Sequence, residues 1–491
     1  MIELASFSEA LERNRAERPD RLALADAATS YSWEQLAAGA ESVARTLEGW
    51  GAGRGGTVVV ALPSSPRWVI AFLACRRAGL TVASAGAPRG KADLRDLCLE
   101  TEAVGIVGDG ACAETAGPVA ARLGIGYLDL ENGGTMLAAE GRGDVRREAE
   151  APAALHFTSG STGRRKAVAR GEAGLVNEGR VIAEVLAGTE GPMTIVSPVF
   201  HSFGSGMLAA ALVAARPALL IPRFRLGDVL ASVSSHRATV LVGVPYVFQC
   251  LTQVGVSPRF DTRSLRLGLA GGTTLHEDLV ARFRERFGAT LVQEYGLSEV
   301  GVVSLNLDDP EGRPWSVGRP LPGLEVTAET AGAEWDGELV VRFAPDRGPG
   351  AERTEGVPTG DLGQVDEAGF VRVTGRLKHL VNVAGVKVAP HEVERRILAS
   401  GACEDVAVVA VPDDLLGERV AAAVVPRAGV SLSSDEFHSH CRRALEAHEI
   451  PRRVLWLDAL PRLESGKPDL QAIRRRLASE EVRKDATVAA D

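Results

Sequence analysis

Few cysteines occur in the sequence, and they are far apart. The 491 residues include six: Cys75, Cys98, Cys112, Cys250, Cys403 and Cys441. Their spacing shows neither the paired C-x-x-C pattern of a zinc site nor the density of a disulfide-rich scaffold. We therefore expect reduced thiols with mostly structural roles.

Long apolar runs are also absent. The longest, from Met207 to Ala215, is ended by Arg216 and Pro217 and is too short to cross a bilayer. The N-terminal stretch carries acidic residues early and lacks an uninterrupted apolar region with a cleavage site, so no export signal is predicted. We expect a cytoplasmic protein that does not enter a membrane.

An excess of positive charge is the third feature that the sequence lacks. The formal net charge is −9 at pH 7, so nucleic-acid binding is not expected, although a local basic patch could still hold an anionic ligand. Hydrophobic residues make up 45% and charged residues 24%, which is typical of a globular protein that folds on its own.

Alternating β-rich and helical stretches predict a parallel α/β architecture. Runs such as 57–62 and 238–243 are typical of strands, and segments such as 66–78 and 277–287 are typical of helices. From Gly337 onward, short strand-like runs are separated by Gly, Pro and Asp, which indicates a hairpin-rich sheet.

The chain is longer than one hydrophobic core usually serves, so more than one domain is expected. After Gly375 a compact α+β region begins, with a strand-like run at 406–411 and an amphipathic helix at 434–446. We predict a large N-terminal domain at 1–377, made of α/β subdomains and a β-rich subdomain, a small α+β domain at 378–478, and a disordered tail at 479–491.

A stretch rich in glycine and hydroxyl residues has the chemistry of a phosphate loop. Residues 158–166 read T-S-G-S-T-G-R-R-K and follow the strand-like run 153–157. Glycines let backbone N–H groups turn toward an anion, hydroxyls add donors, and the final cations neutralise a polyphosphate. The Walker A pattern cannot be laid over it. A flexible Gly/Ser linker is the plainer alternative, but it would need neither the preceding strand nor the following cations.

A second glycine-rich stretch, G-A-G-R-G-G at 51–56, satisfies the dinucleotide fingerprint by letter only. That fingerprint must follow a strand and open a helix, whereas this stretch follows the helical segment 42–50 and precedes the strand 57–62. We interpret it as a turn from helix to strand.

A third run, Q-E-Y-G-L-S-E at 293–299, combines an aromatic ring, a glycine, a hydroxyl and a carboxylate. A buried strand end followed by a turn would account for Tyr295 and Gly296. It would not by itself call for Ser298 and Glu299. A motif this short is weak alone, so its order relative to other motifs matters.

Nearly the whole chain resembles the adenylate-forming superfamily of acyl- and aryl-CoA synthetases, luciferases and nonribosomal-peptide adenylation domains. Five segments carry the resemblance in the family's order: 158–166 is similar to the phosphate loop, 295–299 to Y-G-x-T-E, 359–361 to T-G-D, 375–394 to the hinge and following loop, and 461–467 to the segment with the catalytic lysine. Five matches in sequence make chance convergence very improbable.

The resemblance implies ATP and Mg²⁺ as cofactors and a set of roles that make physical sense. A carboxylate must approach a polyanion, so cations must converge there. The catalytic residues implied are Lys467, Ser298, Glu299 and His201, with Glu299 as the Mg²⁺ ligand. The nucleotide-binding residues implied are Thr158, Ser159, Gly160, Ser161, Thr162, Gly163, Lys166, Gly272, Tyr295, Asp361 and Arg376.

Each of these residues also has a plain structural reading. Alone, Asp361 is read as a turn residue, Arg376 as part of a surface ion pair and Lys467 as a solvated loop lysine. As an ordered set, the functional reading is favoured.

Several positions depart from the family's pattern. The phosphate loop usually ends in P-K-G but here reads Arg165, Lys166, Ala167, which removes a rigid proline and a permissive glycine. Ser298 replaces a threonine and keeps its hydroxyl. Asn382 stands where luciferase-like and many CoA-ligase sequences carry a lysine, which puts a role of that lysine in the second step in doubt here.

The acid-binding residues implied by the resemblance are His201, Phe203, Gly204, Gly271, Gly272, Thr273, Tyr295 and Gly296. V-F-H-S-F-G at 199–204 resembles a segment of acyl- and aryl-CoA ligases in which the histidine approaches the acid; a core histidine is the alternative. Amino-acid-activating domains usually have an aspartate in an F-D dipeptide there. Since a buried ammonium without a partner is disfavoured, we expect an aryl or acyl acid.

The acceptor is the remaining question. Residues 385–394 look more similar to the CoA-ligase segment than to the peptide-synthetase one, so coenzyme A is expected to receive the acyl group. The resemblance makes the C-terminal domain mobile, with Lys378 at the hinge and Gly385 in the loop for the second step. A separate carrier protein, nonthiol chemistry such as activation of nitrite for diazotisation, and a noncatalytic nucleotide sensor or scaffold are alternatives. The chain could be a monomer or a homodimer.

Overall fold

The computed structural model describes residues 4–48, 55–84, 86, 90–132, 135–136, 151–159, 165–253, 258–329, 336–343, 356–413, 415–427, 429–430, 432–463 and 466–478. They form two compact units. The first comprises the described residues up to Pro314 with Leu321–Gly323, and the second comprises Trp315–Pro320, Leu324–Phe343 and the described residues from 356 onward. The domain boundary expected near Lys378 stays a prediction.

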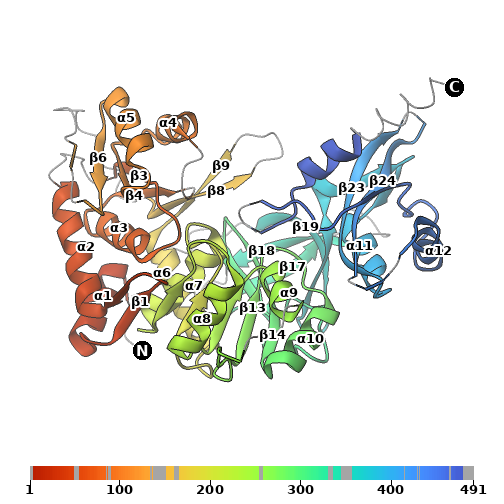
Figure 1. The fold of residues 1–491 in the computed structure, drawn as a ribbon, viewed down its shortest axis with the longest axis horizontal. Coiled ribbons are helices and arrows are strands. Elements are labelled where there is room, and N and C mark those ends of the chain that lie inside the picture. Colours follow the sequence, from red (N-terminus) through yellow and green to blue (C-terminus); the bar gives the residue numbers. More distant parts are fainter. Residues whose placement is uncertain are drawn as a thin grey trace. The chain divides into compact units, whose positions relative to one another are not determined.

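One sheet of the first unit has the strand order β7-β6-β5-β3-β4-β8-β9 (Figure 1). The inner strands are parallel, and the edge strands β7 and β9 are antiparallel to their neighbours. The strands are β3 (Thr57–Val60), β4 (Thr81–Ser84), β5 (Gly105–Gly108), β6 (Gly126–Asp129), β7 (Thr135–Met136), β8 (Ala154–Ser159) and β9 (Arg165–Arg170). Helices α3 (Pro66–Arg77), α4 (Lys91–Glu100) and α5 (Ala113–Leu123) alternate with them.

A second sheet of this unit has the order β15-β14-β13-β12-β10-β11-β1-β2, and its strands from β14 to β1 are parallel. The strands are β1 (Leu22–Ala25), β2 (Ser30–Ser32), β10 (Met193–Ile195), β11 (Ala218–Leu220), β12 (Val240–Gly243), β13 (Leu267–Ala270), β14 (Thr290–Leu297) and β15 (Gly301–Leu305). The helices are α1 (Phe7–Glu17), α2 (Trp33–Glu48), α6 (Glu172–Val185), α7 (Ser202–Val213), α8 (Leu226–His236), α9 (Pro245–Gln253) and α10 (Glu277–Phe287).

The core of this second sheet explains why its strands read as continuous apolar runs. All four residues of β12 are buried, as expected for a parallel strand covered on both faces. Side chains of α8, α9 and α10 pack on it, with Phe248 and Phe283 in edge-to-face contact at 5.3 Å between ring centroids. This packed core holds the sheet in place, so the loops at its strand ends start from fixed positions.

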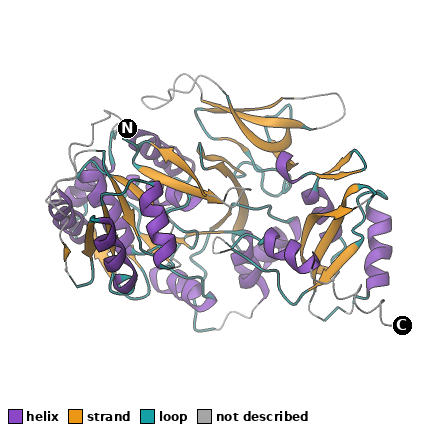
Figure 2. Cartoon of the chain, turned by 90° about the horizontal axis from the view of Figure 1, so that it is seen from above, coloured by secondary structure: helices purple, strands orange, loops and turns teal. Residues whose placement is uncertain are grey.

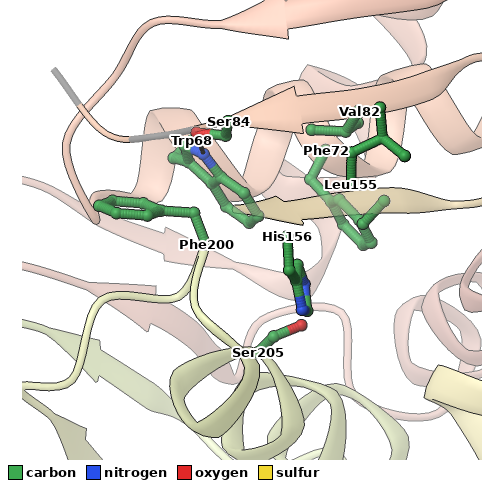
Figure 3. Close-up of a pocket in the computed structure, with 9 residues that line it drawn as sticks. Trp68, Phe72, Val82, Ser84, Leu155, His156, Phe200 and Ser205 are labelled. Atoms are coloured by element: carbon green, nitrogen blue, oxygen red, sulfur yellow. Dashed lines mark hydrogen bonds between the residues drawn. The ribbon is translucent and has the colours of Figure 1, made fainter. Parts of the chain in front are cut away.

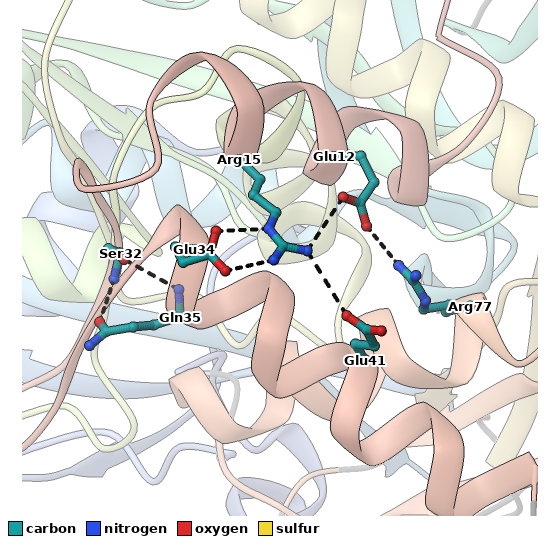
Figure 4. Close-up of polar contacts among 7 residues, drawn as sticks. All are labelled: Glu12, Arg15, Ser32, Glu34, Gln35, Glu41 and Arg77. Carbon is teal, nitrogen blue, oxygen red and sulfur yellow. Dashed lines mark hydrogen bonds and ion pairs between the residues drawn. The ribbon is translucent and has the colours of Figure 1, made fainter.

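Helices α1, α2 and α3 are joined at the surface by an ionic cluster around Arg15 (Figure 4). Arg15 forms two hydrogen bonds with Glu34 at 2.6 and 2.8 Å, which lower the pKa of the Glu34 carboxyl, and Arg77 pairs with Glu12 at 2.8 Å. These side chains are partly exposed, so the cluster orients the helices and adds little stability.

The second unit holds an antiparallel sheet, β17-β18-β19-β20, and a mixed sheet, β22-β21-β24-β23 with β25 beside β24. Figure 2 shows the helices of the chain in purple and its strands in orange. The strands of these two sheets are β17 (Leu324–Glu329), β18 (Gly337–Phe343), β19 (Val357–Val365), β20 (Val371–Arg376), β21 (Val381–Val383), β22 (Val386–Val388), β23 (Cys403–Asp413), β24 (Gly417–Pro426) and β25 (Arg453–Trp456). The short strand β16 (Arg319–Pro320) also belongs to this unit but to neither of these sheets. A 3₁₀ turn, η1 (Leu377–His379), and helices α11 (Pro390–Leu398) and α12 (Ser434–Ala444) complete the list.

The α/β class, with a larger N-terminal part and a smaller C-terminal α+β part, is confirmed. Helix α10 has the predicted bounds, and the predicted run 406–411 lies inside the longer strand β23. The helix predicted at 434–446 ends at Ala444, because Leu445 is already extended. Around the 51–56 stretch, α2 precedes and β3 follows as predicted, while residues 51–54 and the predicted tail at 479–491 lie outside the described residues.

The cysteines and the lengths of the helices were two further subjects of the sequence analysis. All six cysteines, which lie in described segments, are free thiols, and five of them are buried. In the part of the chain that the structure describes, every helix is too short or too polar to span a bilayer.

Candidate nucleotide and acid site

The predicted phosphate loop connects two paired strands of the first unit. Strands β8 and β9 are antiparallel, with Thr158 opposite Lys166 and Ser159 opposite Arg165. The predicted ligands Gly160, Ser161, Thr162 and Gly163 lie outside the described residues, as do the side chains of Thr158 and Ser159. Lys166 is therefore the predicted ligand of this loop whose side chain can be placed.

Lys166 forms an ion pair with Glu299, the predicted Mg²⁺ ligand. The ammonium of Lys166 lies 2.9 Å from Oε1 of Glu299, and the two side chains are 68% and 32% exposed. Glu299 and Ser298 occupy the turn between β14 and β15. Segments 133 residues apart in the sequence thus place a cation and a carboxylate together, both open to an incoming ligand.

Strands β13 and β14 contribute several predicted binding residues. Tyr295 lies on β14 and is 8% exposed, and Gly296 follows it. Gly271 and Gly272 come directly after β13, where the Gly271 N–H donates to the carbonyl of Gly243 at 3.1 Å. Thr273, the next residue, is half-buried.

A residue that the sequence reasoning missed, Glu294, lies between these glycines. It is 4% exposed. A β-carbon built on Gly271 would lie 2.1 Å from Oε2 of Glu294 and 2.9 Å from the Phe203 ring, and one on Gly296 would lie 2.4 Å from Oε1 of Glu294. The carboxyl group therefore packs against the backbone of two predicted acid-binding residues. The sequence shows Glu294 within the run 293–299, but it does not indicate which way the side chain points.

The predicted acid-binding histidine lies at the start of α7. His201 is the N-cap residue of this helix, and its ring lies 4.9 Å from that of Phe200. Phe203 and Gly204 are in the first turn. Ser202 connects the helix to the site, because its hydroxyl donates to the carbonyl of Leu297 at 3.2 Å.

A second missed residue, His156, lies on β8 just before the phosphate loop. It is 4% exposed and lines a cavity of about 10 Å³ with Trp68, Phe72, Phe200 and Ser205 (Figure 3). Its Nδ1 has no hydrogen-bond partner among the described residues. Burial, with smaller effects of Arg170 and His201, lowers its pKa from 6.5 to about 3, so the imidazole is neutral at physiological pH.

Two of the predicted nucleotide-binding residues, Asp361 and Arg376, lie together in the second unit. Asp361 on β19 is opposite Arg376 on β20, and Nε of Arg376 lies 2.5 Å from Oδ1 of Asp361. The Asp361 side chain is 2% exposed and that of Arg376 is 55% exposed. The carboxylate is thus held in place, and the cation reaches solvent.

The predicted catalytic lysine lies on a short loop of the second unit. Lys467 is exposed, and its carbonyl accepts a hydrogen bond from the Leu463 N–H at 2.8 Å. Arg462 donates to the carbonyl of Gly466 at 2.9 Å and pairs with Asp405 on β23. These hydrogen bonds fix the backbone next to Lys467, and the residue itself is exposed.

The predicted hinge and second-step residues lie near β21. Lys378 is exposed in η1. Strands β21 and β22 form a hairpin whose two-residue turn includes Gly385, and Oδ1 of Asn382 accepts the Gly385 N–H at 3.0 Å. Asn382, which departs from the family's lysine, thus stabilises the turn.

Among the described residues no group of three or more His, Cys, Asp or Glu side chains could hold a metal ion. Mg²⁺ at a nucleotide site does not require such a group, since it binds one or two carboxylates together with substrate phosphates and water. The partly exposed Glu299 carboxylate fits this pattern.

Comparison with known proteins gives matches along most of the chain. The family model described as "AMP-binding enzyme" matches residues 11–343, and the "AMP-binding enzyme C-terminal domain" matches 392–467. A CoA ligase from Rhodococcus jostii, named for a methyl-dioxo-octahydroindenyl propanoyl group, is 30% identical; the match covers 93% of this chain and 96% of the relative. A feruloyl-CoA synthase from Amycolatopsis is 28% identical, with 93% and 96% covered.

Solved structures match over similar lengths. ATP-bound MatB from Rhodopseudomonas palustris has a TM-score of 0.81 at 27% identity and covers 96% of this chain and 98% of its own. The amide bond synthetase McbA from Marinactinospora thermotolerans has a TM-score of 0.81 at 25% identity, with 96% and 99% covered.

The buried imidazole of His156 predicts a pH dependence of stability. Between pH 6.5 and about 3 the unfolded chain takes up a proton on this residue that the folded chain does not, so stability falls as the pH is lowered. One such proton is worth about 1.4 kcal/mol per pH unit in the free energy of unfolding. His156→Phe should flatten the decline between pH 6 and 4, measured by urea unfolding. Above pH 7 the slopes of the two proteins should agree; equal slopes in the acidic range would contradict the prediction.

Proposed function

We infer the reaction of this chain from one premise: it belongs to the AMP-binding enzyme family. We propose that it uses ATP and Mg²⁺ to convert a small aryl or acyl carboxylic acid into an acyl-adenylate, and then transfers the acyl group to the thiol of coenzyme A. The observation that carries this proposal is the ion pair of Lys166 and Glu299 at the loop end of the β8–β9 hairpin.

The charges needed for adenylation are available on named side chains. In the first step an oxygen of the acid attacks the α-phosphorus of ATP and pyrophosphate leaves, so negative charge must be stabilised as it develops. Lys467 would contact the acid and the α-phosphate, and Lys166 the outer phosphates. Glu299 would then exchange Lys166 for Mg²⁺, which neutralises the pyrophosphate as it leaves. Asp361 and Arg376 would hold the ribose.

The second step forms the thioester and releases AMP. The sulfur of coenzyme A, having lost its proton, attacks the acyl carbon, and the bond from that carbon to the phosphate oxygen breaks. We propose that residues 378–478 rotate about Lys378 between the two steps, so that the Gly385 turn replaces the Lys467 loop at the reacting atoms.

The acid class is inferred from the residues around Gly271. We propose that the His201 ring, the Phe203 ring and the glycine backbone line the acid site; of these, the Phe203 ring lies close to Gly271. A flat or extended acid would suit such a lining, and the relatives include a feruloyl-CoA synthase.

Coenzyme A is the acceptor that the relatives favour, because both of those described above are CoA ligases or synthases by name. An amine is the alternative acceptor for which an observation exists, namely the likeness to an amide bond synthetase.

A panel of acids with and without acceptors tests the proposal. Purified protein is incubated with MgATP and aryl, short acyl, amino and dicarboxylic acids, and AMP, pyrophosphate and thioester are measured. We expect acid-dependent AMP formation that coenzyme A accelerates, with an acyl-CoA product by mass spectrometry. Formation of ADP, or nucleotide hydrolysis without dependence on any acid, would refute adenylation; amide or carrier-protein products would refute the acceptor alone.

The role of Glu299 predicts the effect of its isosteric amide. Glu299→Gln should lower turnover by about 100-fold or more at limiting Mg²⁺, since even residues that only support a metal ligand are worth about 10–100-fold. The side chain is partly exposed, so the melting temperature should change little. Turnover is measured across a Mg²⁺ titration; an unchanged half-saturating Mg²⁺ concentration would exclude Glu299 as a ligand.

The packing around Gly271 predicts a selective loss of acid binding. Gly271→Ala places a methyl group where Glu294 and Phe203 now lie, so both must move. We expect the KM for the acid to rise about tenfold, corresponding to a loss of about 1.4 kcal/mol, with the KM for ATP within twofold. Gly174→Ala on α6, where a β-carbon meets open space, is the control. Equal increases in both KM values would show that Gly271 is not specific to the acid.

Measuring the two half-reactions separately tests the proposed roles of Lys467 and of the hinge at Lys378. Lys467→Ala should nearly abolish formation of the acyl-adenylate yet leave transfer from supplied acyl-adenylate to coenzyme A largely intact. Lys378→Pro should do the reverse, because proline fixes φ near −65° and restricts a hinge rotation. Both steps are followed by rapid quench and mass spectrometry. If each mutation slows both steps equally, alternation about Lys378 is the wrong mechanism.

A further inference from the structure

A buried ion pair lies directly behind the turn that carries Ser298 and Glu299. Arg170 is the last residue of β9, and Glu178 lies in α6. Nη2 of Arg170 is 2.7 Å from Oε2 of Glu178, and the two side chains are only 7% and 2% exposed. Neither residue belongs to a motif of the family resemblance.

Each member of the pair also contacts the backbone of this turn. Nη1 of Arg170 donates to the carbonyl of Ser298 at 3.3 Å. Oε1 of Glu178 accepts the N–H of Val302 at 2.8 Å. The pair therefore holds the turn at both of its ends, by a donor on one side and an acceptor on the other.

The backbone of the turn is shaped around the carboxylate. Gly301 has φ of +98°, and a β-carbon on it would lie 2.3 Å from Oε1 of Glu178. A β-carbon on Gly206 of α7 would lie 2.6 Å from the same atom. A side chain at either position would displace Glu178, so the carboxylate occupies a slot that two glycines leave open.

Stability alone is a weak reason for such a pair. Burying two charges carries a large desolvation cost, and an apolar pair of similar volume often stabilises a protein equally well. What an apolar pair cannot supply is the donor to Ser298 and the acceptor from Val302. Arg170 also lies on the same strand as Lys166, whose ammonium contacts Glu299, so β9 meets the turn at two places.

We propose that Arg170 and Glu178 form a positioning pair, which fixes the 298–302 turn against the β8–β9 hairpin so that Glu299 and Ser298 stay aligned with the phosphates held by that hairpin. This inference rests on the proposed function. Because the pair acts through the turn, its loss changes binding of MgATP and the rate of adenylation and leaves acid binding unchanged.

A double variant separates this role from a structural one. Arg170→Met with Glu178→Leu removes both buried charges together, so the protein stays folded, while both contacts to the turn are lost. Glu178→Gln, which keeps the shape and an acceptor for Val302, is the conservative variant. Arg180→Ala breaks the exposed Arg180–Glu184 pair on the same helix and is the matched control.

Three measurements read the result. Calorimetry gives the Kd for MgATP, steady-state kinetics give kcat and the KM for the acid, and hydrogen exchange follows the amides of residues 296–305. In the double variant we expect a Kd for MgATP about 10–100-fold weaker, a kcat lowered by a similar factor, an acid KM within twofold and faster exchange in 296–305. Glu178→Gln should recover part of the loss, and Arg180→Ala should match the wild type.

The outcomes distinguish this inference from the proposed function. A folded double variant with wild-type MgATP affinity and wild-type exchange in 296–305 would overturn the positioning role. A uniform loss of MgATP and acid binding in the folded variant would overturn it as well. If instead the wild type binds MgATP but activates no acid, the proposed function fails, whereas weaker MgATP binding in the double variant still supports the pair.

Discussion

Electrostatic repulsion between a carboxylate and a triphosphate is the constraint on which the site depends. The chain as a whole is acidic, with a formal charge of −9, so it cannot attract ATP by net charge. Cations must be concentrated locally instead. Three exposed cations are available: Lys166 at a strand end, Arg376 on a hairpin and Lys467 on a loop. Lys166 and Arg376 each pair with a carboxylate, and the Lys467 backbone accepts a hydrogen bond.

The two compact units divide these charges between them. The first has Lys166 and Glu299 at the edge of firm parallel sheets, and the second has the Asp361–Arg376 pair and the Lys467 loop. The proposed alternation about Lys378 concerns only the part of the second unit that begins at this residue. That part includes the Lys467 loop and the Gly385 turn, whereas the Asp361–Arg376 pair precedes the hinge.

Most of the fold and the ordered motifs could be predicted from the sequence because they depend on local patterns. Helix α10 has an apolar stripe and a glycine at its end, and its bounds were predicted correctly. Asp361 and Arg376 were named separately, and the register of β19 and β20 brings them together. The site roles themselves remain proposals.

Residues whose importance comes from tertiary packing could not be predicted in this way. Arg170 and Ser298 are 128 residues apart, and no period or spacing relates them. Glu294 stood inside a motif, yet the sequence did not reveal that its carboxyl group packs on Gly271. His156 is an isolated histidine in the sequence, and its burial depends on packing. The slot around Glu178 depends on Gly206 of α7 and Gly301 of β15, which are far apart in the sequence. Such contacts are set by how sheets and helices pack.

Transfer of an isotope label tests the central claim most directly. If the acid is activated as an acyl-adenylate, one of its carboxylate oxygens bridges to the α-phosphorus and stays with AMP when the acyl group is transferred. An acid labelled with ¹⁸O in both carboxylate oxygens should therefore yield AMP with one ¹⁸O atom per turnover, measured by mass spectrometry. AMP without the label, or label found in pyrophosphate or inorganic phosphate, would contradict adenylation as the chemistry of this protein.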